Sequence, residues 1–458
     1  MQDNAENRLQ TGALGLTESL IMGVAGTAPA FSLAATVTTL IGAVGMLAVS
    51  SLLYSGLIMF GVTLAFIHLT HVNASAGASF TWVGDIFHPL LGFLCGWSLL
   101  VASSVFMVSG SMPAATATLA LLAPAHLDSP LWVSALAAAW LVFVGVIVIK
   151  GIKATSYTQI LFTVIELGTL LLLIGLAWTN PQVHAVHSFH WQQFSLAAFT
   201  PGVFVAGALI SLFFFWGWDV TLNLNEETRE ASANARKALY GAMSVTLLLY
   251  VGFTATALRL LSDQELAQAG TNVVYVVAER LLPAPWSYLA LLAVTVSTVG
   301  NLETSILQFS RTLFVKSRSG VLPSQFSRLH PRWQTPWAAT LLITGLGLVF
   351  LAGSSWFPSV KSIIQDSVNA ISFQVCFYYS LTSFACAWYF RNDTRQSLKL
   401  TVERVLWPLA TGIFLVFIAL RSIPDFDRIT NIVGIGGIFV GVVPWYLGHR
   451  RKASQLTA

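Results

Sequence analysis

Residues 213–230 read FFFWGWDVTLNLNEETRE, so that Gly217 and Asp219 interrupt the otherwise apolar segment 203–225. An earlier apolar segment, 16–43, is interrupted by AGTAP at residues 25–29. Glycine and proline are the weakest helix formers, so both segments are predicted to break as helices. Interrupted helices at corresponding positions of two repeats indicate a binding site near the bilayer midplane. These two segments therefore decide the fold that we predict.

The composition predicts a membrane protein. Of 458 residues, 55% are hydrophobic and only 9% are charged, against about a quarter charged in soluble domains. Apolar windows long enough to cross the bilayer as helices recur along the whole chain, so we predict an all-α membrane protein with twelve transmembrane helices and the lipid bilayer as its surroundings. The predicted spans are 16–43, 47–69, 88–118, 131–150, 155–178, 203–225, 236–258, 286–315, 337–353, 363–389, 405–420 and 431–448.

The distribution of basic residues predicts the orientation. With the N-terminus in the cytoplasm, 18 of the 23 Lys and Arg fall on the cytoplasmic side, as the positive-inside rule requires. The other five are Arg259, Arg280, Lys361, Arg421 and Arg428. Both termini are thus expected in the cytoplasm of a multi-pass protein of the plasma membrane, specifically a bacterial inner membrane. The net charge of +4 follows from this asymmetry and requires no nucleic-acid partner.

The spans divide into two similar blocks of five, each opened by an interrupted segment. We predict a cytoplasmic tail, a first five-helix repeat, an extracytoplasmic loop, a second repeat, two further helices and a second cytoplasmic tail. Their bounds are 1–15, 16–178, 179–202, 203–389, 390–448 and 449–458. No cleavable signal peptide is expected, because the first apolar run is too long for one.

Three groups of residues are spaced along the chain in a characteristic order. They are Ala76–Phe80 with Gly96 and Trp97; Phe215–Asp219 with Asn225–Arg229 and Ala235–Ala238; and Ser310 and Arg311 with Gly320–Pro323, Thr335 and Pro336. Together they resemble motifs of the amino acid, polyamine and organocation (APC) superfamily of permeases. The resemblance covers nearly the whole chain.

The resemblance implies the LeuT-type architecture, in which two five-helix repeats are inverted relative to each other and helices 1 and 6 are unwound around the substrate. The chain departs from the family at the first break. Many members have a run of Gly and Ser there, whereas this chain has Ala25, Gly26, Thr27, Ala28 and Pro29. Pro29 suits the first turn of a helix but removes one amide that would otherwise meet a substrate carboxylate.

The first break offers backbone groups to an anion. The start of its outer half-helix carries partial positive charge and open amides, so Thr27, Ala28 and Ala30 are candidates for binding an amino acid carboxylate, with Ala25 and Gly26 beside them. The alternative is a proline kink in a packed helix.

The second break offers an acid and aromatic rings. Asp219 is a candidate for the substrate ammonium, as in amine-transporting members of the family, and its alternative role is to cap the following helix. Phe215, Trp216 and Gly217 complete the candidate substrate site, where an aromatic ring can hold an ammonium. For any single Phe of this run, packing is the competing interpretation.

Four acids are predicted to lie at membrane depth, and no Lys or Arg lies in the central portion of any span. They are Glu166, Asp219, Glu303 and Asp366. A charged side chain at that depth costs about 2.5–3.5 kcal/mol on insertion scales. Something cationic is therefore expected to enter the interior, whether an amine substrate, a proton or a metal ion.

Glu166 and two hydroxyl residues are candidates for coupling. Glu166 lies where sodium-independent relatives carry a titratable residue, so it is predicted to carry a coupling proton. The alternative is a protonated Glu bonded to Ser or Thr of a neighbouring helix. Ser297 and Thr298 lie where sodium-coupled relatives place hydroxyl ligands, and helix packing is their alternative role. Proton coupling is favoured over sodium coupling.

The predicted function is that of a secondary active transporter, a permease of symporter type that moves an amino acid across the membrane by alternating access. A transporter or exchanger of polyamines or other organic amines is the alternative. A membrane enzyme would need a nucleophile with a base or a metal cluster, and a channel would need a continuous polar lining. We expect no cofactor, no resident metal and no disulfide, since Cys95, Cys376 and Cys386 all lie inside predicted spans.

Overall fold

The computed structural model describes residues 9–127, 129–354, 360–392 and 397–456. The predicted tails 1–15 and 449–458, and the side chain of Lys361, lie partly or wholly outside the described residues. The described residues are helical apart from their loops and one isolated bridge between Leu14 and Thr228.

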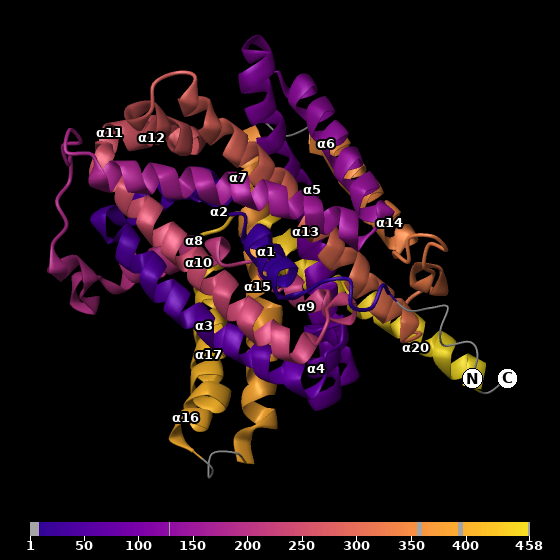
Figure 1. Cartoon of the computed structure of the whole chain (residues 1–458). Coiled ribbons are helices and arrows are strands. Elements are labelled where there is room, and N and C mark those ends of the chain that lie inside the picture. The colour runs from indigo at the N-terminus through magenta and orange to yellow at the C-terminus, as the bar shows by residue number, and fades with distance from the viewer. Residues whose placement is uncertain (1–8, 128, 355–359, 393–396, 457–458) are drawn as a thin grey trace.

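The helices follow one another along the chain, and the longest of the loops between them lie at 180–200 and 319–336 (Figure 1). The first half of the chain contains α1 (Leu16–Thr27), α2 (Pro29–Val44), α3 (Ala48–Val72), α4 (Ser79–Ile86), α5 (Pro89–Leu122), α6 (Pro130–Lys150) and α7 (Ile152–Thr179). The second half contains α8 (Pro201–Phe214), α9 (Val220–Asn223), α10 (Ala231–Leu260), α11 (Asp263–Ala269), α12 (Val273–Leu281), α13 (Leu289–Arg318), α14 (Trp337–Ser354) and α15 (Val360–Tyr389). The last segment contains α16 (Leu398–Thr401), α17 (Trp407–Ser422), α18 (Arg428–Asn431), α19 (Gly437–Val440) and α20 (Val442–Leu456).

Nine helical stretches within the described residues are long and apolar enough to cross a membrane, and the first of them, Leu16–Val72, contains α1, α2 and α3. Two shorter apolar helices, Pro201–Phe214 and Trp337–Gly353, accompany them. Every predicted span coincides with one or more helices, and spans 16–43 and 203–225 are each interrupted by a short non-helical stretch. How many of them cross the bilayer, twelve by our prediction, stays a prediction.

The sequence of α7 explains how a membrane helix packs in this bundle. Its buried polar residues recur every three or four positions and so share one face: Thr155, Gln159, Thr163, Glu166 and Thr169. Large apolar side chains such as Leu161, Val164 and Leu171 are exposed on the opposite face. This polarity is the reverse of that in a soluble bundle, because the surrounding lipid is apolar.

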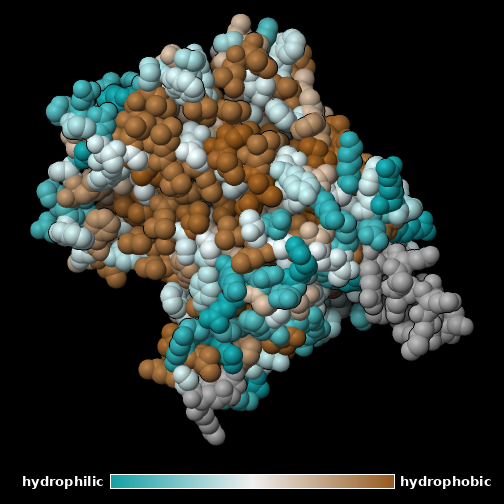
Figure 2. Space-filling view, viewed as in Figure 1, coloured by the Kyte–Doolittle hydropathy of each residue, from teal (hydrophilic) through white to brown (hydrophobic). Residues whose placement is uncertain are grey.

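The two interrupted helices lie in the interior of the bundle. α1 packs against α7, α9, α10 and α13, and α2 packs against α8. Figure 1 shows α1 near the centre, among α10, α13 and α15. The space-filling view shows a broad apolar surface bordered by hydrophilic residues (Figure 2), as expected for a protein whose belt faces lipid.

Candidate functional site

The first break is a single residue, Ala28. Its φ of 43° is left-handed, and its amide donates to the carbonyl oxygens of Val24 and Ala25 at the end of α1. Pro29 then begins α2, where its missing N–H costs nothing. The predicted residues Ala25, Gly26 and Thr27 form the last turn of α1, and Ala30 lies in the first turn of α2. All of them are buried.

The second break is longer. α8 ends at Phe214 and α9 begins at Val220, so that Phe215–Asp219 connect the two without α-helical structure. Gly217 has a φ of 103°, a conformation that L side chains rarely adopt. This backbone conformation explains why the sequence motif has a glycine at position 217.

The two breaks are in direct contact. A Cβ added to Gly217 would lie 2.1 Å from the carbonyl oxygen of Gly26, and one added to Gly26 would lie 2.2 Å from that of Gly217. No side chain fits between the segments at this point. The contact joins two residues that lie 191 positions apart in the sequence.

Glu166 reaches the first break from α7. Its Oε1 accepts a hydrogen bond from the Ala30 amide at 2.7 Å and another from the Ser297 hydroxyl at 2.6 Å. The Ser297 hydroxyl oxygen in turn accepts the Phe31 amide at 3.1 Å. Glu166 is 1% exposed. A carboxyl group and a hydroxyl from α7 and α13 thus cap the start of α2.

The carbonyl side of the first break is also bonded. Thr27 O accepts the Tyr250 hydroxyl at 3.0 Å and the Ser32 hydroxyl at 2.7 Å. The Thr27 hydroxyl donates to Val24 O at 2.8 Å and lies 3.1 Å from the Thr246 hydroxyl. Thr298, the second hydroxyl suggested for sodium, donates to Val294 O of its own helix at 2.6 Å.

Asp219 points toward α15. Its two carboxylate oxygens accept the hydroxyls of Tyr378 and Tyr379, each at 3.0 Å. Asp219 occupies the N-cap position of α9, but its side chain makes no capping hydrogen bond there. The alternative role as a helix cap is therefore wrong for this side chain. Within the described residues, neither Asp219 nor Glu166 forms an ion pair.

Aromatic rings connect the two breaks. Trp216 donates its indole N–H to the Tyr378 hydroxyl at 3.0 Å and packs edge-on against Phe106, with 5.6 Å between ring centroids. Phe106 packs in turn against Phe31 of α2. Phe215 instead faces Tyr250 on α10. Trp216 thus reaches the first break through Phe106 and Phe31, and Phe215 reaches it through Tyr250, whose hydroxyl donates to Thr27 O.

The two other acids predicted to lie at membrane depth, Glu303 and Asp366, have different surroundings. Glu303 is buried on α13 and accepts the Gln159 side-chain amide at 2.6 Å. Gln159 also donates to Gly300 O at 2.8 Å. Asp366 is partly exposed near the start of the described side chains of α15.

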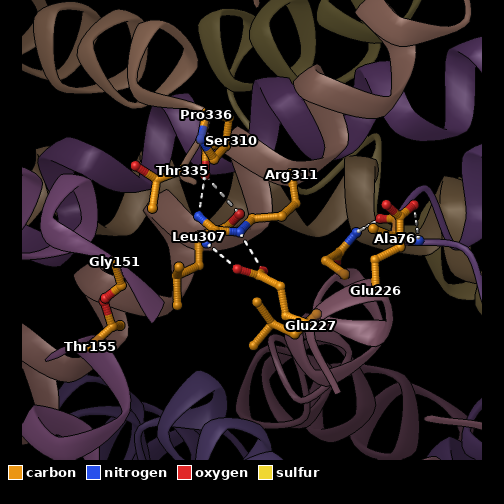
Figure 3. Close-up of polar contacts among 12 residues, drawn as sticks. Ala76, Gly151, Thr155, Glu226, Glu227, Leu307, Ser310, Arg311, Thr335 and Pro336 are labelled. Carbon is orange, nitrogen blue, oxygen red and sulfur yellow. Dashed lines mark hydrogen bonds and ion pairs between the residues drawn. The ribbon is translucent and has the colours of Figure 1, made fainter. Parts of the chain in front are cut away.

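The two ends of the bundle differ in how they close. Near Arg311, the guanidinium group forms a bidentate pair with Glu227 at 2.9 and 3.0 Å, and both side chains are fully buried. Figure 3 shows this pair, with Glu226 beside Ala76. Arg318 forms a second bidentate pair with Glu226. We call this the Arg311 end.

The opposite end, which we call the Asp425 end, is hollowed. A cavity of about 530 Å³ lies between α2, α8, α15 and α17. Its lining runs from Phe213, two residues before the second break, to Asp425 and Arg421. The cavity therefore extends from the region of the breaks toward this end of the helices.

Comparison with known proteins assigns the family. The model of the family described as "Amino acid permease" matches residues 13–453. The chain belongs to this family.

Curated relatives match over most of their length. The serine/threonine exchanger SteT of Bacillus subtilis is 26% identical over 393 residues, which are 82% of this chain and 83% of SteT. The large neutral amino acids transporter small subunit 2 of Oryctolagus cuniculus is 24% identical over 89% of this chain and 74% of its own. The human Asc-type amino acid transporter 1 is 25% identical over 89% and 76%. This family member is thus a multi-pass membrane transporter and not an enzyme.

Sequence reasoning missed several partners of the candidate site residues. Tyr378 and Tyr379 hold Asp219, Tyr250 holds the end of α1, and Gln159 holds Glu303. A usable signal existed for the first two, because adjacent hydroxyl-bearing rings in the middle of an apolar span need polar partners inside the bundle.

Proposed function

We propose that this permease carries an amino acid across a bacterial inner membrane by alternating access, with both termini in the cytoplasm. In this proposal, segments 16–178 and 203–389 are inverted five-helix repeats, and α1/α2 and α8/α9 are their two discontinuous membrane helices. Segment 390–448 adds two helices. The observation that carries the proposal is the contact between the breaks at Gly26 and Gly217, with a buried carboxyl group beside each. Such paired breaks are the usual substrate sites of this kind of carrier.

The substrate ammonium binds at Asp219. The Asp219 carboxylate lies among Tyr378, Tyr379 and Trp216. The rings of these residues add cation–π attraction for the substrate ammonium to the charge of the acid. The described residues offer Asp219 only neutral partners, so a cationic ligand gains its full attraction. The substrate carboxylate binds the start of α2 around Ala30.

A polyamine or another organic amine is the second candidate substrate. The observation that favours it is the occupation of the Ala30 amide by Glu166, because a ligand without a carboxylate leaves that contact undisturbed.

Glu166 carries the coupling proton. It is buried at the first break, and no Lys or Arg among the described residues pairs with it. Burial without a counter-ion favours the neutral, protonated form at some stage of transport. Sodium is the less favoured ion, because the Ser297 hydroxyl oxygen already accepts a hydrogen bond from the Phe31 amide.

Alternating access involves the two ends described above. The paired charges at the Arg311 end close the cytoplasmic side, and the cavity leads from the Asp425 end to the breaks. Transport requires the Glu227–Arg311 and Glu226–Arg318 pairs to separate when the carrier opens inward.

The test is uptake into proteoliposomes. Each of the twenty amino acids, and the amines putrescine and agmatine, is offered with a proton gradient alone and with a sodium gradient alone. Accumulation of an amino acid under the proton gradient is expected. Sodium-driven accumulation at clamped pH contradicts proton coupling. If only the amines are taken up, the substrate is an organic amine and not an amino acid.

A matched pair of variants sharpens this test. Glu166→Gln is expected to abolish concentrative uptake while exchange partly survives, because the side chain keeps its shape but cannot carry the proton. Glu303→Gln, the same substitution at the buried acid that accepts the Gln159 amide, is the control. Equal losses in both variants contradict a specific role for Glu166.

A further inference from the structure

Only two backbone N–H groups at the start of α2 have no backbone carbonyl as their acceptor. Pro29 has no N–H, and the Ser32 amide donates to Ala28 O at 2.9 Å. The remaining amides, of Ala30 and Phe31, donate to Glu166 Oε1 at 2.7 Å and to Ser297 Oγ at 3.1 Å. Side chains of the protein itself therefore occupy both positions at which an external carboxylate would bind this helix start.

The occupant at Ala30 is chemically the same group as the substrate's own anion. Glu166 is 1% exposed, and Oε1 also accepts the Ser297 hydroxyl at 2.6 Å. A second carboxylate brought to the same amide would meet a like charge in a medium of low dielectric constant, where repulsion is strong. An ionised Glu166 and a bound substrate carboxylate therefore exclude each other.

Few other titratable groups face this position. Tyr250 on α10 lies across the break and donates to Thr27 O. Glu303 on α13 lies beside Gln159, seven residues before Glu166 along α7. The charged groups on α6 and α12, Lys150, Glu279 and Arg280, are exposed. Glu166 is thus the titratable group in direct contact with the Ala30 amide.

We propose, building on the function above, that Glu166 reserves the substrate carboxylate site and yields it only when protonated. A proton from the solution on the side of substrate entry forms an O–H bond at the Glu166 carboxylate. The neutral carboxyl group leaves the Ala30 N–H, and the substrate carboxylate accepts that hydrogen bond instead. When the substrate leaves, the O–H bond breaks, the proton follows the substrate, and the Glu166 carboxylate returns to Ala30. One proton accompanies each zwitterion.

The proposal separates two classes of ligand. An amino acid needs the Ala30 amide, so its binding requires protonated Glu166. The decarboxylated amine of the same amino acid presents only an ammonium group, binds at Asp219, and leaves Glu166 ionised at Ala30. The affinity for the amino acid then falls as pH rises, and the affinity for the amine does not.

The experiment is isothermal titration calorimetry on the full-length protein in nanodiscs from pH 5 to pH 8. Three matched pairs are titrated: serine and ethanolamine, leucine and isopentylamine, arginine and agmatine. For a pair that binds, the affinity for the amino acid is expected to fall by about tenfold per pH unit above the midpoint, which is the limit for one linked proton. The affinity for the amine is expected to change by less than about twofold over the whole range.

Two outcomes overturn the inference while leaving transport itself intact. One is a parallel weakening of amino acid and amine with pH, and the other is a pH-independent affinity for both. Absence of binding by every compound at every pH overturns this inference, and the proposed function falls only if none of the twenty amino acids is taken up into proteoliposomes.

Variants identify the titrating group. Glu166→Gln is expected to hold the amino acid affinity near the low-pH value of the wild type and to remove the pH slope, whereas Glu303→Gln keeps the slope. A slope that survives in Glu166→Gln overturns the assignment. If that variant does not fold, Ser297→Ala serves, because it removes a hydrogen bond to the ionised carboxylate and moves the binding midpoint to higher pH. An unchanged midpoint in Ser297→Ala overturns the assignment as well.

Discussion

Each helix break has a buried carboxyl group beside it, but the hydrogen-bond partners of the two carboxyl groups differ. At the first, the backbone turns at Ala28, and a carboxyl group from another helix, Glu166, comes to the backbone. At the second, the break itself carries the acid, Asp219, and hydroxyls from another helix come to it. One carboxyl group therefore accepts from a backbone amide and a serine hydroxyl, and the other from two phenol hydroxyls.

We propose that this difference gives the two acids different tasks. Glu166 occupies a position that suits an anion, so its charge competes with an anionic ligand. Asp219 is surrounded by aromatic rings and neutral donors, so its charge attracts a cationic ligand. A zwitterion satisfies both breaks at once only if Glu166 gives way, which links the pair to a proton.

The contact between the breaks gives the largest expected effect. In Gly217→Ala, the new methyl group would lie 2.1 Å from Gly26 O, and the φ of 103° is strained for any L residue. Backbone strain of this kind costs about 1–3 kcal/mol before the collision is counted. We expect transport to fall below detection and thermal stability to decrease, as measured by uptake and by melting in detergent.

Gly168→Ala is the matched control for that substitution. Gly168 lies on α7, its φ is not in the left-handed region, and an added Cβ meets nothing within 4 Å. It should retain wild-type uptake. A Gly217→Ala variant that transports as well as this control would mean that the breaks do not need their close contact.

The second effect concerns Asp219 alone. If its carboxylate binds the substrate ammonium, Asp219→Asn removes a charge-assisted hydrogen bond worth about 1.5–3 kcal/mol, or about ten- to a hundredfold in affinity. Folding should be retained, because the amide still accepts a hydrogen bond. Affinity is measured by competition for uptake, with Asp366→Asn as the control at a partly exposed acid of α15. Unchanged affinity for amino acids and amines alike would leave Asp219 with only the task of holding the tyrosines.

Much of this arrangement could be predicted from the sequence, because its signals are local. Pro29 after Ala28 and Gly217 before Asp219 indicate that the helices break there. The spacing of polar residues on α7 indicates that Glu166 lies on the inner face of that helix. The partners could not be predicted. Glu166 meets an amide 136 residues away, and Asp219 meets hydroxyls 159 and 160 residues away. Such contacts depend on the register between packed helices, which no local pattern specifies.

The same dependence on register separates Ser297 from Thr298, which were predicted together as hydroxyl ligands. The two are neighbours in sequence, but successive helix positions point in different directions. Ser297 faces Glu166, whereas the hydroxyl of Thr298 bonds to its own helix at Val294. The two hydroxyls therefore have different acceptors, and their roles as ion ligands stay a prediction.

The smallest effect separates the two tyrosines that hold Asp219. Tyr378→Phe and Tyr379→Phe each remove one hydroxyl from the carboxylate, so each should weaken substrate affinity by about 0.5–1.5 kcal/mol, or about two- to tenfold. Their stabilities should differ. The Tyr378 hydroxyl also accepts the indole N–H of Trp216, and its loss leaves that buried donor without its partner, which costs about a further 1–3 kcal/mol. We therefore expect similar affinities for the two variants but a lower melting temperature for Tyr378→Phe. Equal melting temperatures would show that Trp216 does not depend on this bond, and an affinity loss in Tyr378→Phe alone would assign ammonium binding to the Trp216 side of Asp219.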